Sequence, residues 1–186
     1  MRHQPISPAS PAGLSQPSPH GGRIGQNQIV PVSVTESAAD AMNNVTTRPA
    51  AADVEWLTAV FLGSFREAIT AARGTWDEVR ESVQFREQLD LASTRIIDLD
   101  GRAVGFFMSP ARDTDVELHT LCITPECQSQ RVGTYIARGL ISDARASGRG
   151  VVLSVLKVNE RARTFYARLG FVGAQESKHH YRMRLG

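Results

Sequence analysis

Aromatic residues are absent from the first part of this sequence: in a chain of 186 residues, no Phe, Trp or Tyr occurs before Trp56. Residues 1–44 also carry only four charged side chains, which cancel, while six of the nine prolines fall in the first 31 residues. Such a segment cannot bury enough apolar surface to offset a backbone entropy of about 1–2 kcal/mol per residue. We therefore expect a disordered tail over residues 1–44 and one folded domain over residues 45–186. Met42, near the end of the tail, is a candidate start codon.

Four further features exclude classes of protein. No run of 18 or more apolar residues occurs, so no membrane span is expected, and no continuous apolar stretch near the N-terminus suggests a secretory signal. Two cysteines, Cys122 and Cys127, are too few for a disulfide scaffold and favour a reducing compartment, which predicts a cytoplasmic protein. A net charge of +2 is too small to indicate a nucleic-acid partner.

From residue 45 onward, the hydrophobic period alternates between helix and strand. A short β-prone stretch precedes a helix with Asp53 as its N-cap, and a second helix is expected to start near Thr75. Asp100-Gly101 separates two β-prone runs, which is typical of a hairpin. The remaining expected elements are a strand over 116–123, a helix over 132–147, a strand over 151–158, a helix capped by Asn159 and a final strand over 181–185. This order predicts a mixed α/β sheet with helices packed on it.

Residues 116–134 run from a strand through a turn directly into a helix that begins near Gly133. Unpaired backbone N–H groups converge at the positive end of such a helix, which makes this turn a potential anion site. Any strand-turn-helix connection has such amides, so an ordinary turn is the alternative.

A second stretch, residues 158–171, makes the anion site more specific. Asn159 lies at the end of a strand, and Tyr166 follows seven residues later on the next helix. Together the two stretches resemble the GNAT superfamily of acyl-CoA-dependent N-acyltransferases. The family's phosphate loop, Gln/Arg-x-x-Gly-x-Gly/Ala, corresponds to Gln128–Gly133. Its later signature, Asn-x-x-Ala-x-x-apolar-Tyr followed by apolar-Gly-Phe, corresponds to Asn159, Ala162, Tyr166 and Leu169-Gly170-Phe171.

The resemblance covers most of residues 45–186 and implies a mixed, mostly antiparallel central sheet flanked by about four helices. It also implies acetyl-CoA as co-substrate. The residues that it assigns to acetyl-CoA are Leu121 and Ile123, whose backbone would pair with the pantetheine arm, the loop residues Gln128, Ser129, Gln130, Arg131, Val132, Gly133 and Thr134, and Asn159. Arg131 departs from the pattern, because it stands where the family has its first glycine; its side chain would either hinder the pyrophosphate or donate to it.

The chemistry of amine acylation suggests the catalytic residues. A lysine-like amine with a pKa of about 10.4 is neutral only about once in 2,500 at pH 7, a deficit of about 4.6 kcal/mol, so a base is useful. Glu117, on the strand that leads to the loop, is the candidate base; the alternatives are a solvated strand carboxylate and one that attracts a cationic substrate. Tyr166 resembles the family's general acid, which protonates the departing thiolate; the alternative is a core tyrosine. Asn159 is a helix cap in either case.

Other polar residues carry weaker signals. His119, Cys122 and Cys127 suggest a metal site, but strand alternation puts His119 and Cys122 on opposite faces, so no metal is expected. His179 and His180 are either an exposed pair or part of the acceptor site. Arginines on the last helix form a solvated face or reach a cofactor phosphate: Arg161, Arg163 and Arg168.

We therefore expect an acetyl-CoA-dependent N-acetyltransferase that acts on a primary amine of a small molecule or peptide. The alternatives are a non-catalytic acyl-CoA sensor, in which Arg131 has altered the site, and an interaction module whose tail recruits a partner. The resemblance implies that the acceptor site is shaped by residues 53–90 and the final strands, where no motif identifies the amine. The oligomeric state is open, a homodimer being one possibility.

Overall fold

A computed structural model describes residues 44–110, 112 and 114–185; of the predicted tail, residues 1–43 lie outside this range. In chain order the elements are β1 (Val45–Pro49), α1 (Val54–Arg73), α2 (Glu78–Gln88), the short 3-10 helix η1 (Leu91–Ser93), β2 (Thr94–Leu99), β3 (Arg102–Met108), β4 (Asp115–Leu118), β5 (Thr120–Ile123), the 3-10 turn η2 (Pro125–Cys127), α3 (Val132–Ala146), β6 (Gly150–Leu156), α4 (Glu160–Arg168), β7 (Val172–Glu176) and β8 (His180–Leu185). None of the described helices is long and apolar enough to cross a membrane.

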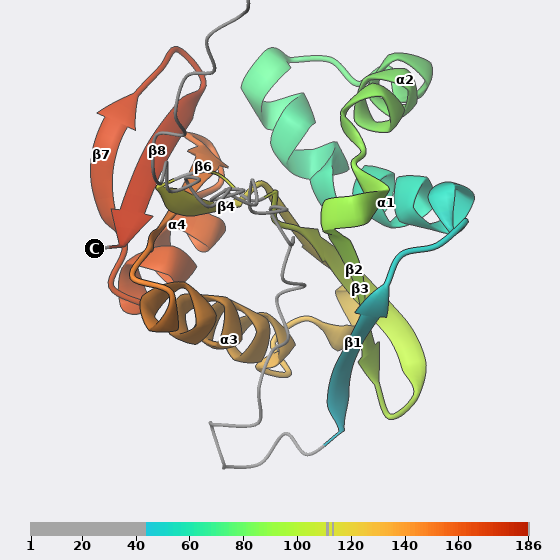
Figure 1. Cartoon of the computed structure of the whole chain (residues 1–186). Helices are drawn as coiled ribbons and strands as arrows, with labels where there is room; N and C mark the ends of the chain where they lie inside the picture. The colour runs from blue at the N-terminus through green and yellow to red at the C-terminus, as the bar shows by residue number, and fades with distance from the viewer. Residues whose placement is uncertain (1–43, 111, 113, 186) are drawn as a thin grey trace, which may run out of the picture.

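The strands form two four-stranded sheets, with orders β1-β2-β3-β5 and β4-β6-β8-β7 (Figure 1). Every pairing is antiparallel except that of β4 with β6. The β2–β3 hairpin turns at Asp100 and Gly101, whose φ angles of 52° and 75° are both positive, as a two-residue hairpin turn of this type requires. The prediction of a mixed, mostly antiparallel sheet with about four helices is confirmed.

Two hydrophobic clusters hold the layers together. The larger cluster joins α3 and α4 to both sheets through side chains such as Phe107, Ile136, Leu140 and Leu153. The smaller cluster lies on the other face of the first sheet, where α1 and α2 pack through Leu57 and through the Phe85 and Phe106 rings, whose centroids are 5.8 Å apart. The first sheet is therefore covered on both faces, with α1 and α2 on one side and α3 on the other (Figure 1).

The strand predicted over 116–123 is wrong as a single element, because it breaks at His119. β4 pairs with β6 in the second sheet, whereas β5 pairs with β3 in the first sheet. The His119 N–H donates to the Met108 carbonyl at 2.9 Å, so the break is held by a backbone hydrogen bond. Both β4 and β5 keep the apolar pattern of a buried strand, so the break between them could not be recognised in the sequence.

Two element boundaries differ from the expectation, and one strand was not predicted. The second helix was expected to start near Thr75, but α2 begins at Glu78 with Asp77 as its N-cap. The Asp77 carboxylate accepts from the Arg80 N–H at 3.0 Å, and its negative charge is stabilised at the positive end of the helix. β6 ends at Leu156 rather than at Val158, which lies in a turn and is 44% exposed. β7 was not predicted; all five of its residues are exposed, so it has no buried apolar face to mark it.

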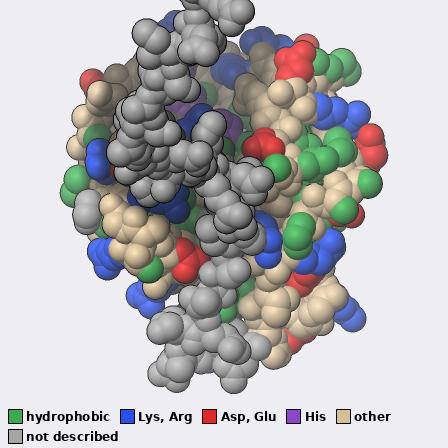
Figure 2. Space-filling model, in the orientation of Figure 1, with side chains coloured by type: hydrophobic (Ala, Val, Ile, Leu, Met, Phe, Trp, Pro, Cys, Tyr) green, Lys and Arg blue, Asp and Glu red, His purple; other side chains and the backbone are tan. Residues whose placement is uncertain are grey.

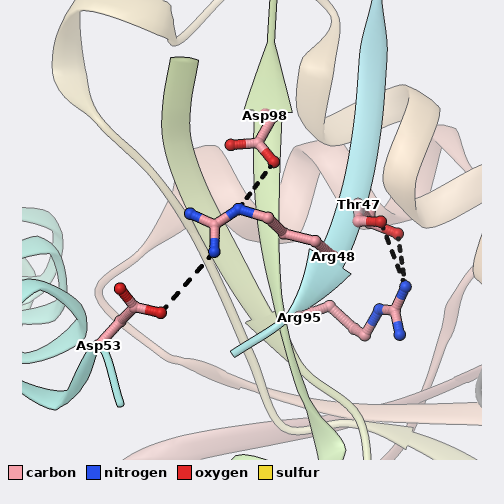
Figure 3. Close-up of polar contacts among 5 residues, drawn as sticks. All are labelled: Thr47, Arg48, Asp53, Arg95 and Asp98. Carbon is pink, nitrogen blue, oxygen red and sulfur yellow. Dashed lines mark hydrogen bonds and ion pairs between the residues drawn. The ribbon is translucent and has the colours of Figure 1, made fainter. Parts of the chain in front are cut away.

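Arg48 ties the beginning of the domain together (Figure 3). Its guanidinium donates to Asp98 of β2 at 3.1 Å and lies 3.8 Å from Asp53, the N-cap of α1. Arg95 of β2 donates in turn to the Thr47 carbonyl at 3.2 Å. The cap position predicted for Asp53 is confirmed, but its carboxylate pairs with Arg48 instead of a helix amide. These contacts connect β1, β2 and the start of α1.

The backbones of β3 and β5 approach each other closely at Gly105 of β3. A Cβ atom at this position would lie 2.2 Å from the Cys122 carbonyl oxygen of β5. We expect Gly105→Ala to lower the free energy of unfolding by about 3 kcal/mol, because neither backbone can move without breaking the ladder. Urea denaturation followed by circular dichroism measures the change.

Gly63, in the interior of α1, is the matched control, because a Cβ atom added there would point into open space, with no contact within 4 Å among the described residues. Gly63→Ala should raise the free energy of unfolding by up to about 1 kcal/mol through helix propensity. Equal stabilities for Gly105→Ala and the wild type would contradict the close approach of β3 and β5.

Candidate active site

A cavity of about 1180 Å³ opens where the two sheets separate. One wall is the face of α1 around Gly63, Ser64 and Ala68, and the floor is β5. The other walls are the loop that follows β5 and one side of α4. The walls come from elements that are far apart in the sequence, so the cavity forms only when the domain is folded.

The edge of β5 that faces away from β3 carries no neighbouring strand within the described part of the chain. Leu121, Cys122 and Ile123 all line the cavity. An extended ligand can therefore use free backbone groups of this edge, as an added strand would. The Ile123 carbonyl is already engaged, because the Gln128 side chain donates to it at 3.0 Å and so anchors the loop to the strand.

The loop leads directly into the N-terminus of α3. The first hydrogen bond of this helix runs from the Tyr135 N–H to the Arg131 carbonyl at 3.0 Å, so the N–H groups of Val132, Gly133 and Thr134 have no acceptor within the helix. Gly133 and Thr134 line the cavity. Donors at a positive helix end suit a phosphate or another anion.

Two loop residues other than glycine adopt left-handed backbone conformations. Ser129 and Arg131 both have φ of 65°. The Ser129 hydroxyl accepts from the Arg161 guanidinium of α4 at 3.2 Å, so the loop is also tied to α4. The bend at these residues turns the loop into α3, and its cost is of the order of 1–2 kcal/mol for each non-glycine residue.

Tyr166 lies on the face of α4 that lines the cavity, and it is only 9% exposed. Burial raises the pKa of its hydroxyl above the ordinary value, and the Cys122 thiol acts in the same direction. Burial also raises the pKa of Cys122, against the effect of the neighbouring Ser64 hydroxyl. Both groups are therefore neutral at physiological pH, and Tyr166 keeps a proton that it can donate.

This arrangement agrees with a comparison of the sequence with protein families. Residues 62–171 match the acetyltransferase (GNAT) family. The chain belongs to this family. It is therefore an acyltransferase, with acetyl-CoA as its co-substrate. A comparison with curated proteins finds no match.

Solved structures of GNAT acetyltransferases share the fold. The PaiA N-acetyltransferase of Thermoplasma acidophilum, in complex with coenzyme A, has 18% identity and a TM-score of 0.61 over 75% of this chain and 97% of that one. A GCN5-related N-acetyltransferase from Rhodopseudomonas palustris has 20% identity and a TM-score of 0.61 over 78% and 97%. Arabidopsis thaliana Naa50, in complex with the bisubstrate analogue CoA-Ac-MVNAL, has 14% identity and a TM-score of 0.58 over 77% and 99%. At these identities the likeness is one of fold.

Most residues that the GNAT resemblance assigns to acetyl-CoA lie at the cavity. These are Leu121, Ile123, Gln128, Ser129, Arg131, Gly133, Thr134 and Asn159. Two others do not line it: Val132 is buried in the larger cluster, and the exposed Gln130 donates to the Glu126 carbonyl at 2.8 Å. The Asn159 side chain caps α4 by accepting from the Ala162 N–H at 2.9 Å. This cap is as predicted, and it places Asn159 beside the cavity.

Glu117 lies on β4 and is not among the residues that line the cavity. Its carboxylate accepts from Arg112 at 2.9 Å and lies 3.8 Å from the His119 imidazole. Val116 and Leu118 pack in the larger cluster, so alternation directs Glu117 to the opposite side of the sheet. That is also the side on which Cys122 packs in the smaller cluster, beneath α1.

The break at His119 removes the basis of the expectation that His119 and Cys122 lie on opposite faces, which assumed one continuous strand. His119 lies beside Glu117, and the alternation does not continue across the break to Cys122. Within the described ranges, His, Cys, Asp and Glu side chains form no group of three or more that could hold a metal ion.

His179 and His180 do not line the cavity. Burial lowers the pKa of His180, and the charges of His179 and Arg73 act in the same direction. The effect of Arg73 places His180 near the end of α1.

The resemblance implied that residues 53–90 shape the acceptor site, but the sequence singled out no residue of α1. Gly63, Ser64 and Ala68 line the cavity, and the Ser64 hydroxyl is buried against the Cys122 thiol. The available signal was the presence of these small residues next to the bulky Phe61 and Phe65 of the same helix. Small side chains at these positions leave room between α1 and β5, where Phe or Leu would fill the cavity.

Arg131 shows why the family pattern has glycine at this position, since its φ of 65° is a conformation that glycine adopts without steric cost. We expect Arg131→Gly to raise the free energy of unfolding by up to about 1 kcal/mol, because the relief of strain exceeds the added freedom of the unfolded chain. Urea denaturation measures the change. The neighbouring Gln130 lacks a positive φ, so Gln130→Gly should not stabilise the protein. A loss of stability in Arg131→Gly would show that contacts of the Arg131 side chain outweigh the backbone strain.

Proposed function

We propose that this protein transfers the acetyl group of acetyl-CoA directly to a primary amine of a small molecule or peptide. The observation that carries the proposal is the meeting of three features in one cavity: the free edge of β5, the unpaired amides at the start of α3, and the Tyr166 hydroxyl. The Naa50 structure, which contains an analogue that joins CoA to the peptide MVNAL, supports a peptide as one kind of acceptor.

Acetyl-CoA would bind with its pyrophosphate at the start of α3, where Gly133 and Thr134 present their N–H groups. The guanidinium of Arg131, which also lines the cavity, would add a charge-assisted hydrogen bond. From there the pantetheine arm would follow the edge of β5, between α1 and α4. This path directs the thioester toward Cys122 and Tyr166.

Acetyl transfer then needs one bond formed and one broken. The amine nitrogen attacks the thioester carbonyl, a C–N bond forms, and the C–S bond breaks as the electron pair leaves with sulfur. Its raised pKa keeps Tyr166 protonated over the physiological range, so that it can donate its proton to the departing thiolate; the phenolate that is left regains a proton from water. The amine loses one proton and the thiolate gains one, so the products are an amide and CoA.

Glu117 would accept the proton of the amine. It lies on β4, just before the β5 strand that lines the cavity, and on the side of the sheet opposite the larger cluster. Arg112 holds the carboxylate in one orientation. Because Glu117 does not line the cavity, a water molecule would connect it to the amine.

Tyr166→Phe tests the general acid. We expect kcat to fall about 100-fold or more, because the thiolate then leaves without a donor, while the Kd for acetyl-CoA changes less than about twofold. Thiol release measures turnover, and isothermal titration measures binding. Tyr135→Phe makes the same chemical change on α3 outside the cavity and should retain full activity. Unchanged turnover in Tyr166→Phe would remove Tyr166 from the mechanism, and absence of acetyl-CoA binding by the wild type would overturn the proposed function.

Glu117→Gln tests the base. The amide can still accept from Arg112, so the fold should be retained, while kcat/KM at pH 7 should fall about 100-fold. This deficit should shrink between pH 7 and pH 9, because roughly 100 times more of a lysine-like amine is neutral at the higher pH. Initial rates across this range measure both effects. Glu176, which pairs with Lys157 at 3.2 Å, provides the control in Glu176→Gln; equal rates for the two variants would rule out Glu117 as the base.

A further inference from the structure

A second hollow, of about 350 Å³, lies between α3 and α4. Its lining consists of three arginines, a serine and two apolar residues: Arg138, Ile141, Ser142, Arg145, Arg168 and Leu169. Arg168 also lines the larger cavity, so the two spaces adjoin at this side chain. Lys and Arg side chains, in blue, are among those over α3 in Figure 2.

None of the three arginines is in an ion pair or hydrogen bond with any side chain across residues 44–110, 112 and 114–185. Arg138, Ser142 and Arg145 are spaced by four and three positions, which directs all of them to one face of α3. Asp143 is not part of the lining. The hollow therefore gathers three positive charges with no carboxylate among its own residues.

Ordinary helix electrostatics accounts for two of these positions. Arg145 lies in the last turn of α3 and Arg168 in the last turn of α4, where the helix dipole favours a cation. Arg138 lies in the middle of α3, where the dipole offers no such stabilisation. No carboxylate among the described residues that line the hollow offsets its repulsion by the other two guanidinium groups, and a bound anion would relieve this repulsion.

The lining indicates which anion fits. Guanidinium groups present flat pairs of N–H donors that match two oxygens of a phosphate, and Ser142 adds a hydroxyl donor. Ile141, which is buried, and the half-buried Leu169 supply apolar surface beside the three exposed arginines. The lining offers donors almost exclusively, so a cation or a neutral ligand would leave them unpaired.

We propose that Arg138, Arg145 and Arg168 form a binding site for a phosphate monoester, next to the acetyl-CoA cavity. Two sources share this chemistry. One is the 3′-phosphate of acetyl-CoA itself, and this source rests on the proposed function. About 7.5 Å of helix axis separates Gly133, at the pyrophosphate end, from Arg138, and the shared Arg168 connects the spaces. The other source is a separate phosphorylated metabolite.

The first experiment compares CoA with dephospho-CoA, which lacks only the 3′-phosphate. If the 3′-phosphate is the ligand, the wild type should bind CoA at least about tenfold more tightly than dephospho-CoA by isothermal titration. Arg138→Ala should raise the Kd for CoA about tenfold and leave that for dephospho-CoA unchanged. Arg145→Ala should act in the same direction. Arg102→Ala removes the same charge from the exposed β2–β3 hairpin and should change neither value.

The second experiment uses inorganic phosphate as the probe, with the protein saturated with acetyl-CoA and ionic strength held constant with chloride. If the ligand is a separate phosphate, the melting temperature should rise with phosphate, and Arg138→Ala should need about ten times more phosphate for the same rise.

An effect that depends on Arg138 in either experiment supports the site and identifies the source. Equal affinities for CoA and dephospho-CoA together with no response to phosphate would overturn it, while the proposed function would stand. If neither form of CoA binds, the proposed function fails; the phosphate titration, then run without acetyl-CoA, still decides whether the site exists.

Discussion

The separation of β4 from β5 at His119 is the constraint on which the rest of this structure depends. One chain segment belongs to two sheets, because β4 pairs with β6 while β5 continues along β3. The sheets diverge from this point, so the far edge of β5 is left open and a cavity forms between α1 and α4. The break also shifts the alternation of side chains, and Glu117 and Cys122 project to the same side as a result.

Features that depend on neighbouring residues could be predicted from the sequence. The Asp100-Gly101 turn and the Asn159 cap follow from the conformational preferences of a few adjacent residues, and both are present. The phosphate loop was recognisable for the same reason, since its spacing reflects one turn and the first turn of α3. The family assignment, and with it the fold, followed from two such local patterns in the correct order.

Features that depend on packing between distant elements could not be predicted. Residues 116–123 satisfy the pattern of one buried strand equally well whether they join one sheet or two, so the break was invisible. β7 was missed because all of its residues are exposed. The sequence implied a role for residues 53–90, but which α1 residues wall the cavity, and the arginine-lined hollow, depend on the relative positions of elements far apart in the chain. For the same reason, the exposure of Val79 and Val83 on α2 could not be predicted from the sequence. Figure 2 shows hydrophobic side chains (green) over α1 and α2.

The open edge of β5 has a consequence for solubility. Unpaired strand edges invite pairing with strands of other molecules, and proteins protect them by shortness, bulges or cover. β7, at the outer edge of the second sheet, has an irregular register between Gly173 and Gln175, which disfavours the addition of a regular strand. The edge of β5 is only four residues long and lies within a cavity walled by α1 and α4. A slender, extended arm can reach it, whereas a strand that brings its own sheet cannot, so the same recess that admits a ligand protects the protein against aggregation.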